Sequence, residues 1–260
     1  MEVVILDSAE AGARFVADAV VGLLHRDPRA VLGLATGSSP LLVYAELVAR
    51  CRRGEVSFAG AQAFLLDEYV GLPVGHRQAY GTVIEAELTG HVDLPPGAVH
   101  GLDPGAPDVE AECRRYEDTI RAAGGIDLQL LGIGRDGHIG FNEPGSSLGS
   151  RTRIKTLAHR TREDNARFFD VGEQVPRHVL TQGLATIRDA RHLVLVAAGP
   201  HKADAVAAAV EGPVTAVCPA SVLQLHPHVT VVLDGPAASR LRLRDYFQET
   251  YAAKPPWQDI

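Results

Sequence analysis

The stretch "DLQLLGIGRDGHIGFNEPGSS", residues 127–147, decides between two kinds of α/β protein. An apolar run leads directly into the pattern G-x-G-x-x-G at 132–137, which is typical of a dinucleotide-binding turn. In such a turn the last glycine opens a long helix, and an acidic residue ends the next strand about 20 positions later. Here Pro144 and Gly145 would break that helix, and the acidic residues at 163–164 lie in a helical stretch. The sequence therefore predicts a loop that carries chemistry itself and no nicotinamide or flavin cofactor.

Apolar runs alternate with helical periodicity along the rest of the chain. The predicted strands are 3–6, 30–35, 62–66, 126–131, 192–198 and 228–233, and the predicted helices are 8–26, 40–53, 78–89, 108–123, 161–170 and 201–210. Continuous apolar strands separated by helices indicate an α/β fold with a mostly parallel, doubly wound (Rossmann-like) sheet flanked by helices. The Pro- and Gly-rich segment 93–108 reads as a surface connection, so residues 1–260 are expected to form a single domain.

Composition narrows the class of protein. In 260 residues, 46% are hydrophobic and 22% are charged, which is ordinary for a globular domain. The net charge of −7 argues against a nucleic-acid partner, and no apolar run is long enough to predict a membrane span. The three cysteines are widely spaced and form no C-x-x-C pair, which favours a reducing compartment and buried structural thiols. We expect a cytoplasmic protein.

A parallel sheet places its ligand site in the loops after the strands' carboxyl ends. The first such loop is "ATGSSP" (35–40), whose polar positions are Thr36, Gly37, Ser38 and Ser39. Backbone N–H groups at the start of a helix bind a phosphate or carboxylate, and Pro40 is suited to the first helical turn. The alternative is a tight turn with a capping hydroxyl and no ligand.

The second loop begins at Asp67 and Glu68, directly after an apolar strand. A carboxylate there faces the ligand crevice, where partial loss of water raises its pKa toward that of a useful general base. The alternative is an aspartate that caps the next segment through its side chain.

The third loop places Asp136, His138 and Glu143 within eight residues. Imidazole exchanges protons near neutral pH, and a carboxylate beside it fixes its tautomer. A metal site is disfavoured because no second His or Cys stands at ligand spacing, and a polar surface loop remains the other alternative. The following segment, 150–157, carries basic residues at alternate positions, which a strand would present on one face as an anion site or as a solvated surface.

These loops together resemble the glucosamine-6-phosphate deaminase family. The matching segments are "LGLATGSSP" (32–40), "LLDEYVGLP" (65–73), "GIGRDGHIGFNEPGSSLGSRTRIKTL" (132–157), "NARFFD" (165–170) and "VLQLHP" (222–227). The related 6-phosphogluconolactonases share the loop up to His138 but differ after it, where this chain continues "IGFNEPGSS".

The resemblance implies conversion of glucosamine 6-phosphate and water to fructose 6-phosphate and ammonia, with no cofactor and no metal. It implies that His138 opens the sugar ring with Asp136 and Glu143 orienting it, and that Asp67 moves the C2 proton to C1. Glu68 and Tyr69 would be positioning groups. The phosphate would be held by Thr36, Gly37, Ser38, Ser39, Arg167 and Lys202.

The resemblance also implies regulation. Some members of the family are hexamers activated by N-acetylglucosamine 6-phosphate at a site between subunits. The positions that match that site are Ser146, Arg153, Lys155 and Tyr246. We therefore expect a homo-oligomer, as large as a hexamer, with an allosteric activator.

Two other functions are weighed against the deaminase. A lactonase on the same fold would not need a C2 base at Asp67. A sugar-phosphate sensor would carry a separate DNA-binding helix-turn-helix, whereas residues 1–6 begin directly on a predicted strand. The chain also departs from the family at Arg135, where Pro or Asn is common, and at 216–221, which lacks the family's Trp-Thr pair.

Overall fold

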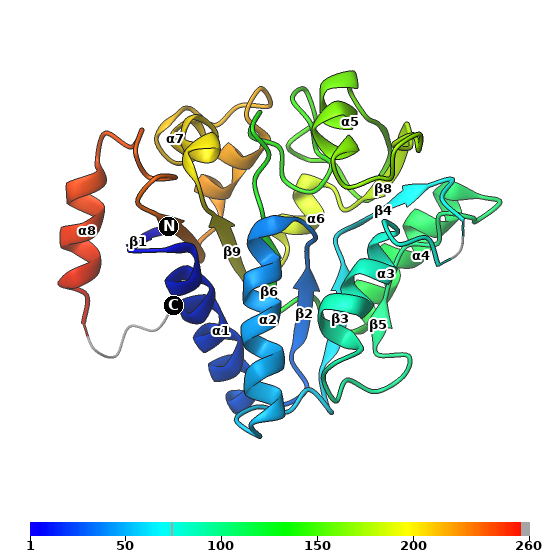
Figure 1. Cartoon of the computed structure of the whole chain (residues 1–260), viewed down its shortest axis with the longest axis horizontal. Helices are drawn as coiled ribbons and strands as arrows, with labels where there is room; N and C mark the ends of the chain where they lie inside the picture. The colour runs from blue at the N-terminus through cyan, green and yellow to red at the C-terminus, as the bar shows by residue number, and fades with distance from the viewer. Residues whose placement is uncertain (74, 256–260) are drawn as a thin grey trace.

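The six apolar runs form six of the seven strands of one parallel sheet (Figure 1). The computed structural model describes residues 1–73 and 75–255, so the expected single domain at 1–260 includes positions outside the described residues. The sheet order is β1-β10-β9-β6-β2-β3-β5, and every neighbouring pair is parallel. The strands are β1 (Glu2–Leu6), β2 (Val31–Leu34), β3 (Gln62–Leu65), β5 (Val99–His100), β6 (Leu128–Leu131), β9 (His192–Ala197) and β10 (Val229–Asp234).

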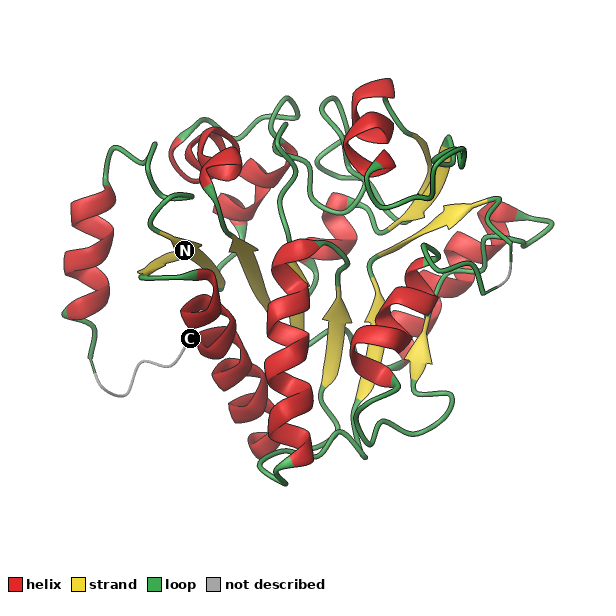
Figure 2. Cartoon of the chain, in the orientation of Figure 1, coloured by secondary structure: helices red, strands yellow, loops and turns green. Residues whose placement is uncertain are grey.

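Helices cover both faces of this sheet, as Figure 2 shows. The helices are α1 (Ala9–Arg26), α2 (Ser38–Arg52), α3 (Tyr80–Ile84), η1 (Glu85–Thr89), α4 (Val109–Ala122), α5 (His159–Ala166), α6 (Leu184–Arg188), η2 (Pro200–Lys202), α7 (Ala203–Glu211), η3 (Pro219–Leu225) and α8 (Arg244–Ala252). One core lies between the sheet and α1, α2, α3 and η1, and a second lies between the sheet and α4, α6, α7 and η3. The consecutive strand residues Leu130 and Leu131 enter opposite cores, which is why this strand is apolar throughout. The doubly wound α/β fold predicted from the sequence is confirmed.

The order of the strands reverses between β2 and β6. From β2 the chain continues outward to β3 and β5, and then returns to the other side of β2 as β6 before continuing to β9 and β10. The loops that leave the carboxyl ends of β2 and β6 therefore diverge. This is the place where open α/β sheets bind ligands.

A second, three-stranded sheet was not predicted as a unit. It contains β4 (Asp67–Val70), β8 (His178–Thr181) and β7 (Arg153–Thr156) in the order β4-β8-β7, and both pairs are antiparallel. Within the basic segment 150–157, Arg153 and Lys155 lie on β7, whereas Arg151 precedes the strand. The sheet was missed because its four-residue strands are brought together from three distant segments, and so short a run carries little periodicity of its own.

Smaller differences concern element boundaries. α2 begins at Ser38, two residues before the predicted start, because proline is tolerated within the first turn of a helix. The segment 93–108 contains β5, whose two residues pair with β3. The sequence analysis also missed α6, η3 and α8, which packs on β1 at the far edge of the sheet. No helix of the described residues has the length and apolar character needed to cross a bilayer.

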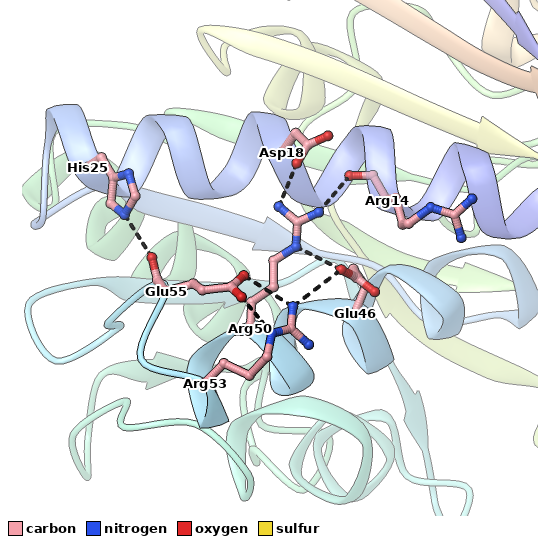
Figure 3. Close-up of polar contacts among 7 residues, drawn as sticks. All are labelled: Arg14, Asp18, His25, Glu46, Arg50, Arg53 and Glu55. Atoms are coloured by element: carbon pink, nitrogen blue, oxygen red, sulfur yellow. Dashed lines mark hydrogen bonds and ion pairs between the residues drawn. The ribbon is translucent and has the colours of Figure 1, made fainter.

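A polar network joins the first two helices (Figure 3). The Arg50 guanidinium on α2 lies 2.6 Å from Asp18 on α1 and 2.8 Å from Glu46 one helical turn away. The Arg50 side chain is only 13% exposed, whereas that of Asp18 is 66% exposed, so the network lies at the edge of the helix–helix contact with its acidic partner in water. These contacts fix α1 against α2, whose N-terminus borders the reversal point of the sheet.

Candidate active site

Two glycines of the loop after β6 make room for neighbouring side chains, a role that differs from that of the glycines in a dinucleotide-binding turn. A Cβ atom on Gly134 would collide with the imidazole ring of His138, and the Gly134 N–H donates to the His138 carbonyl at 2.9 Å. Gly137 has φ +82°, and a Cβ there would lie 2.6 Å from the Cys218 sulfur. The glycines therefore make room for the histidine and for the neighbouring loop. The next regular element is β7 instead of a long helix, so the structure confirms the argument against a dinucleotide turn.

The structure pairs His138 with Asp136. Nδ1 of His138 lies 2.6 Å from Oδ1 of Asp136, and the His138 backbone N–H donates to the same oxygen at 3.2 Å. Burial acts to raise the pKa of Asp136, but the hydrogen bond and the charge of His138 outweigh burial and lower it. Among the described residues Nε2 of His138 has no hydrogen-bond partner. An ionised Asp136 thus orients the ring and leaves Nε2 to exchange a proton with a ligand.

Asp67 and Glu68 are both buried but are held very differently. The Glu68 carboxylate accepts hydrogen bonds from the backbone N–H groups of Tyr69, Tyr80 and Gly81, at 2.7 to 2.9 Å. Within residues 1–73 and 75–255 the Asp67 carboxylate has no hydrogen bond, and it is 5% exposed. Burial, with the charge of Glu68 adding to it, raises the pKa of Asp67 well above its ordinary value.

This difference assigns the two carboxylates. Glu68 is occupied by the N-terminus of α3, so the capping alternative applies to Glu68 and not to Asp67. Asp67 is the first residue of β4, and its carboxylate, with no hydrogen bond among the described residues and a raised pKa, has the properties of a general base.

Glu143 lies away from the role expected for it. Its carboxylate accepts hydrogen bonds from the Ala158 backbone N–H, at 3.0 and 3.2 Å, and from the Thr161 hydroxyl. Ala158 is the N-cap of α5, so Glu143 anchors that helix. No hydrogen bond joins Glu143 to His138 among the described residues. The Glu143 carboxylate therefore holds the α5 segment, whereas the sequence analysis expected it to orient the imidazole of His138.

The residues expected to bind phosphate lie around the point where the strand order reverses, between β2 and β6. Gly37, with φ +111°, precedes α2, and within the part of the chain that the structure describes no side chain caps the first N–H groups of that helix. Nζ of Lys202 donates to the Ile133 carbonyl at 2.6 Å, directly beside Gly132, which lies against Pro40 of α2. Together these contacts place the ammonium and the helix N-terminus around the same loop.

Positive charge accumulates at this point. Lys202 is half-buried, and burial lowers its pKa, followed by the charges of Arg167 and Arg135. The pKa of His201 is lowered by burial and by the same cations together with Lys202. Arg167 and Arg135 are exposed, and Ser38 and Gly37 are accessible at the start of α2. The structure therefore gathers the side chains of Lys202, Arg167, Arg135 and His201 near the loop after β6.

An aromatic cluster beside Asp67 was not found from the sequence. Tyr69 contacts Tyr80, Phe141 and Phe169, with ring centroids 4.9 to 5.8 Å apart, and its hydroxyl accepts from the Asn165 amide at 2.8 Å. These side chains come from segments up to 100 residues apart, so no local pattern predicts their contact. These aromatic side chains connect β4, the strand that begins at Asp67, with the α5 segment, and they exclude water from the contact between the two.

The four residues expected to bind an activator do not meet within one chain. Arg153 and Lys155 lie two positions apart on β7 and are half-buried, and Ser146 is buried with no hydrogen bond from its hydroxyl among the described residues. Tyr246, 59% exposed, is on α8 at the opposite side of the molecule (Figure 1). Among the described residues no group of three His, Cys, Asp or Glu is arranged to hold a metal.

The fold and these residues define a class of sugar-phosphate enzymes. The profile of the glucosamine-6-phosphate isomerases/6-phosphogluconolactonase family matches residues 7–232, and the chain belongs to this family. Glucosamine-6-phosphate deaminases of Beutenbergia cavernae and Mycolicibacterium smegmatis are 63% and 60% identical to it, each over 100% of this chain and 100% of their own. The resemblance noted in the sequence is thereby confirmed.

Solved structures agree with this family. A monomeric glucosamine-6-phosphate deaminase is 40% identical, with a TM-score of 0.90 over 92% of this chain and 100% of its own. The 6-phosphogluconolactonase from Trypanosoma cruzi has a TM-score of 0.73 at 20% identity, over 93% of this chain and 97% of its own, and shares the fold.

Proposed function

We propose that this protein is a glucosamine-6-phosphate deaminase of amino-sugar catabolism, which converts glucosamine 6-phosphate and water to fructose 6-phosphate and ammonia. The observation that carries the proposal is Asp67, a buried carboxylate with no hydrogen bond among the described residues. Moving a proton between adjacent carbons requires a base held close to both. Lactone hydrolysis has no such step, and the relatives that match over the whole chain are deaminases.

In the proposed mechanism, the substrate phosphate binds at the N-terminus of α2, with Lys202 and Arg167. His138 transfers a proton to the ring oxygen as the pyranose opens, and Asp136 holds the imidazole in place. Asp67 then removes the C2 proton, which gives an enolamine, and returns it to C1. Water adds to the resulting C2 imine, and the amine leaves as ammonia, so that all atoms are accounted for.

The proposal predicts that ammonia and fructose 6-phosphate form in equal amounts from glucosamine 6-phosphate. Asp67→Asn supplies the control, because it keeps the shape of the side chain but cannot take the proton. Failure of the folded protein to release ammonia would refute the deaminase, and hydrolysis of 6-phosphogluconolactone would then identify the alternative.

The proposal extends to regulation. Ser146, Arg153 and Lys155 would bind the phosphate of N-acetylglucosamine 6-phosphate, with Tyr246 contributed by another subunit of a hexamer, because Tyr246 lies far from the other three in one chain. A relative of the same fold is monomeric, which makes assembly the point to test. Light scattering measures the oligomeric state, and the rate as a function of substrate concentration, with and without the activator, measures the regulation. A monomer whose hyperbolic rate curve does not change with the activator would refute the proposed regulation.

A cytoplasmic location belongs to the same proposal. It is supported by the three free cysteines, of which Cys113 and Cys218 are buried and Cys51 is partly buried, because a reducing compartment keeps such thiols free.

A further inference from the structure

A buried glutamine, Gln182, lies between the two halves of the proposed acid–base site. We infer that Gln182 is a positioning residue for Asp67: it holds the two carbonyls that precede Asp67 and ties them to the loop of His138. This inference rests on the proposed function, because it concerns the same reaction.

The position of Asp67 depends on its backbone. Its carboxylate has no hydrogen bond among the described residues, so no donor fixes the side chain directly. Leu65 is the last residue of β3 and Asp67 is the first residue of β4, so Leu66 alone links the two sheets at this point. Whatever holds the carbonyls of Leu65 and Leu66 therefore sets where the Asp67 oxygens lie.

Gln182 contacts both carbonyls. Its backbone N–H donates to the Leu66 carbonyl at 2.9 Å, and its side-chain Nε2 donates to the Leu65 carbonyl at 3.4 Å. The Tyr116 hydroxyl on α4 donates to the same Leu65 oxygen. Gln182 is 0% exposed, so no water competes with these contacts.

The same segment holds the histidine loop. The carbonyl of Gln182 accepts a hydrogen bond from Nδ2 of Asn142 at 2.8 Å, and the hydroxyl of Thr181 accepts one from the Phe141 N–H at 3.1 Å. Thr181 also pairs with Asp67 in the β4–β8 register. Thr181 and Gln182 thus contact the Asp67 turn on one side and the loop of His138 on the other.

Burial of a glutamine does not by itself indicate this role. Gln129 is also 0% exposed, and both glutamines have an Oε1 without a hydrogen bond among the described residues. Gln129, however, donates only to the Leu130 carbonyl of its own strand, and its amide fills the space beside Gly33. The two side chains differ in what they hold, which makes Gln129 a matched control.

The experiment compares Gln182→Met with Gln129→Met, which remove the same buried amide at similar volume. Loss of an amide and its unpaired oxygen together costs little stability, so both variants are expected to fold. Displacement of a catalytic group by up to about 1 Å costs roughly 10- to 100-fold in rate, so Gln182→Met should lower kcat by that factor and leave KM within about twofold. Gln129→Met should keep the parent kcat.

A second readout separates positioning from loss of folded protein. With substrate deuterated at C2, the isotope effect on kcat should rise in Gln182→Met, because proton removal by a misplaced Asp67 becomes slower than the other steps. A smaller folded fraction lowers kcat but leaves the isotope effect unchanged. If Gln182→Met does not fold, Tyr116→Phe removes the other side-chain donor to Leu65 and is expected to show the same rise.

The outcomes separate this inference from the proposed function. No ammonia from the unsubstituted protein would overturn both. Turnover by the unsubstituted protein, with parent kcat and isotope effect in Gln182→Met, would overturn the positioning role alone. An equal fall in both methionine variants, without a change in isotope effect, would also overturn it.

Discussion

Acidification from pH 7 to pH 5 is expected to destabilise the protein through His192. This residue begins β9, is 7% exposed, and has its Nε2 2.9 Å from the Thr230 hydroxyl. Its ring stacks on that of His228, with centroids 3.7 Å apart and planes within 3°. Burial, followed by the charges of His228 and His226, lowers the pKa of His192 to about 3. The fold therefore requires a neutral imidazole at this position.

The magnitude follows from the difference between the two states. In the unfolded chain the histidine pKa is about 6.5, so below that pH the unfolded chain takes a proton that the folded protein refuses. Stability is complete above about pH 6.5 and falls as the pH drops toward the folded pKa of about 3. At pH 5 the loss from His192 is about 2 kcal/mol. In a chain of this size that corresponds to a fall in Tm of roughly 4–8 °C.

Urea unfolding at pH 7 and pH 5 measures this effect in the parent protein and in His192→Gln. The free-energy difference between the two proteins should change by about 2 kcal/mol between the two pH values, because the titrations of groups that do not contact residue 192 cancel. His178→Gln, at the exposed first residue of β8, is the control for replacement of a histidine that is not buried. A change below about 0.5 kcal/mol for His192→Gln would mean that burial does not hold this histidine neutral and would refute the argument.

Three further predictions concern the site and its support. Asp67→Asn should lower kcat by about 10²–10⁴-fold. It should nevertheless raise Tm, because it removes a buried carboxylate that has no partner among the described residues. A Tm at or below that of the parent would contradict the predicted gain in stability. Arg50→Met should cost about 1 kcal/mol in urea unfolding, against less than about 0.5 kcal/mol for Arg114→Met, whose side chain is 66% exposed; equal costs would show that the α1–α2 network adds nothing. Lys202→Met should raise KM for glucosamine 6-phosphate by about 10- to 100-fold. In the parent protein, KM should begin to rise at a lower alkaline pH than an ordinary lysine would give, because the pKa of Lys202 is lowered. A KM that does not change at alkaline pH would argue against contact between Lys202 and the phosphate.

Local patterns predicted the main sheet because its strands are buried on both faces. A run such as "LQLL" is apolar throughout only when both of its sides meet helices, so the run itself reveals its surroundings. The small sheet left no such signal. β4 begins with two carboxylates and β7 alternates basic residues with others, so these strands are recognised only once β8 lies between them.

The candidate site likewise combines residues that local sequence identified with residues that only the tertiary contacts revealed. Loop composition identified Asp136 and His138, which are two residues apart and pair directly. The role of Glu143 toward His138 stays a prediction, and loop composition did not reveal the partners of its carboxylate, Ala158 and Thr161, because they lie at the start of a helix whose position the loop does not specify. Gln182 was missed since its contacts reach Leu65, 117 residues away.

The sequence by itself determined that the protein has a doubly wound parallel sheet and that polar loops follow its strands, because periodicity and turn chemistry are local. Only the tertiary structure showed what holds each of two adjacent carboxylates. Asp67 and Glu68 are neighbours of similar chemistry, and the sequence separated their expected roles only through the family resemblance. The backbone N–H groups of Tyr80 and Gly81 in α3, together with that of Tyr69, donate three hydrogen bonds to Glu68, and among the described residues none is donated to the Asp67 carboxylate, since side chains alternate across a strand and face different surroundings.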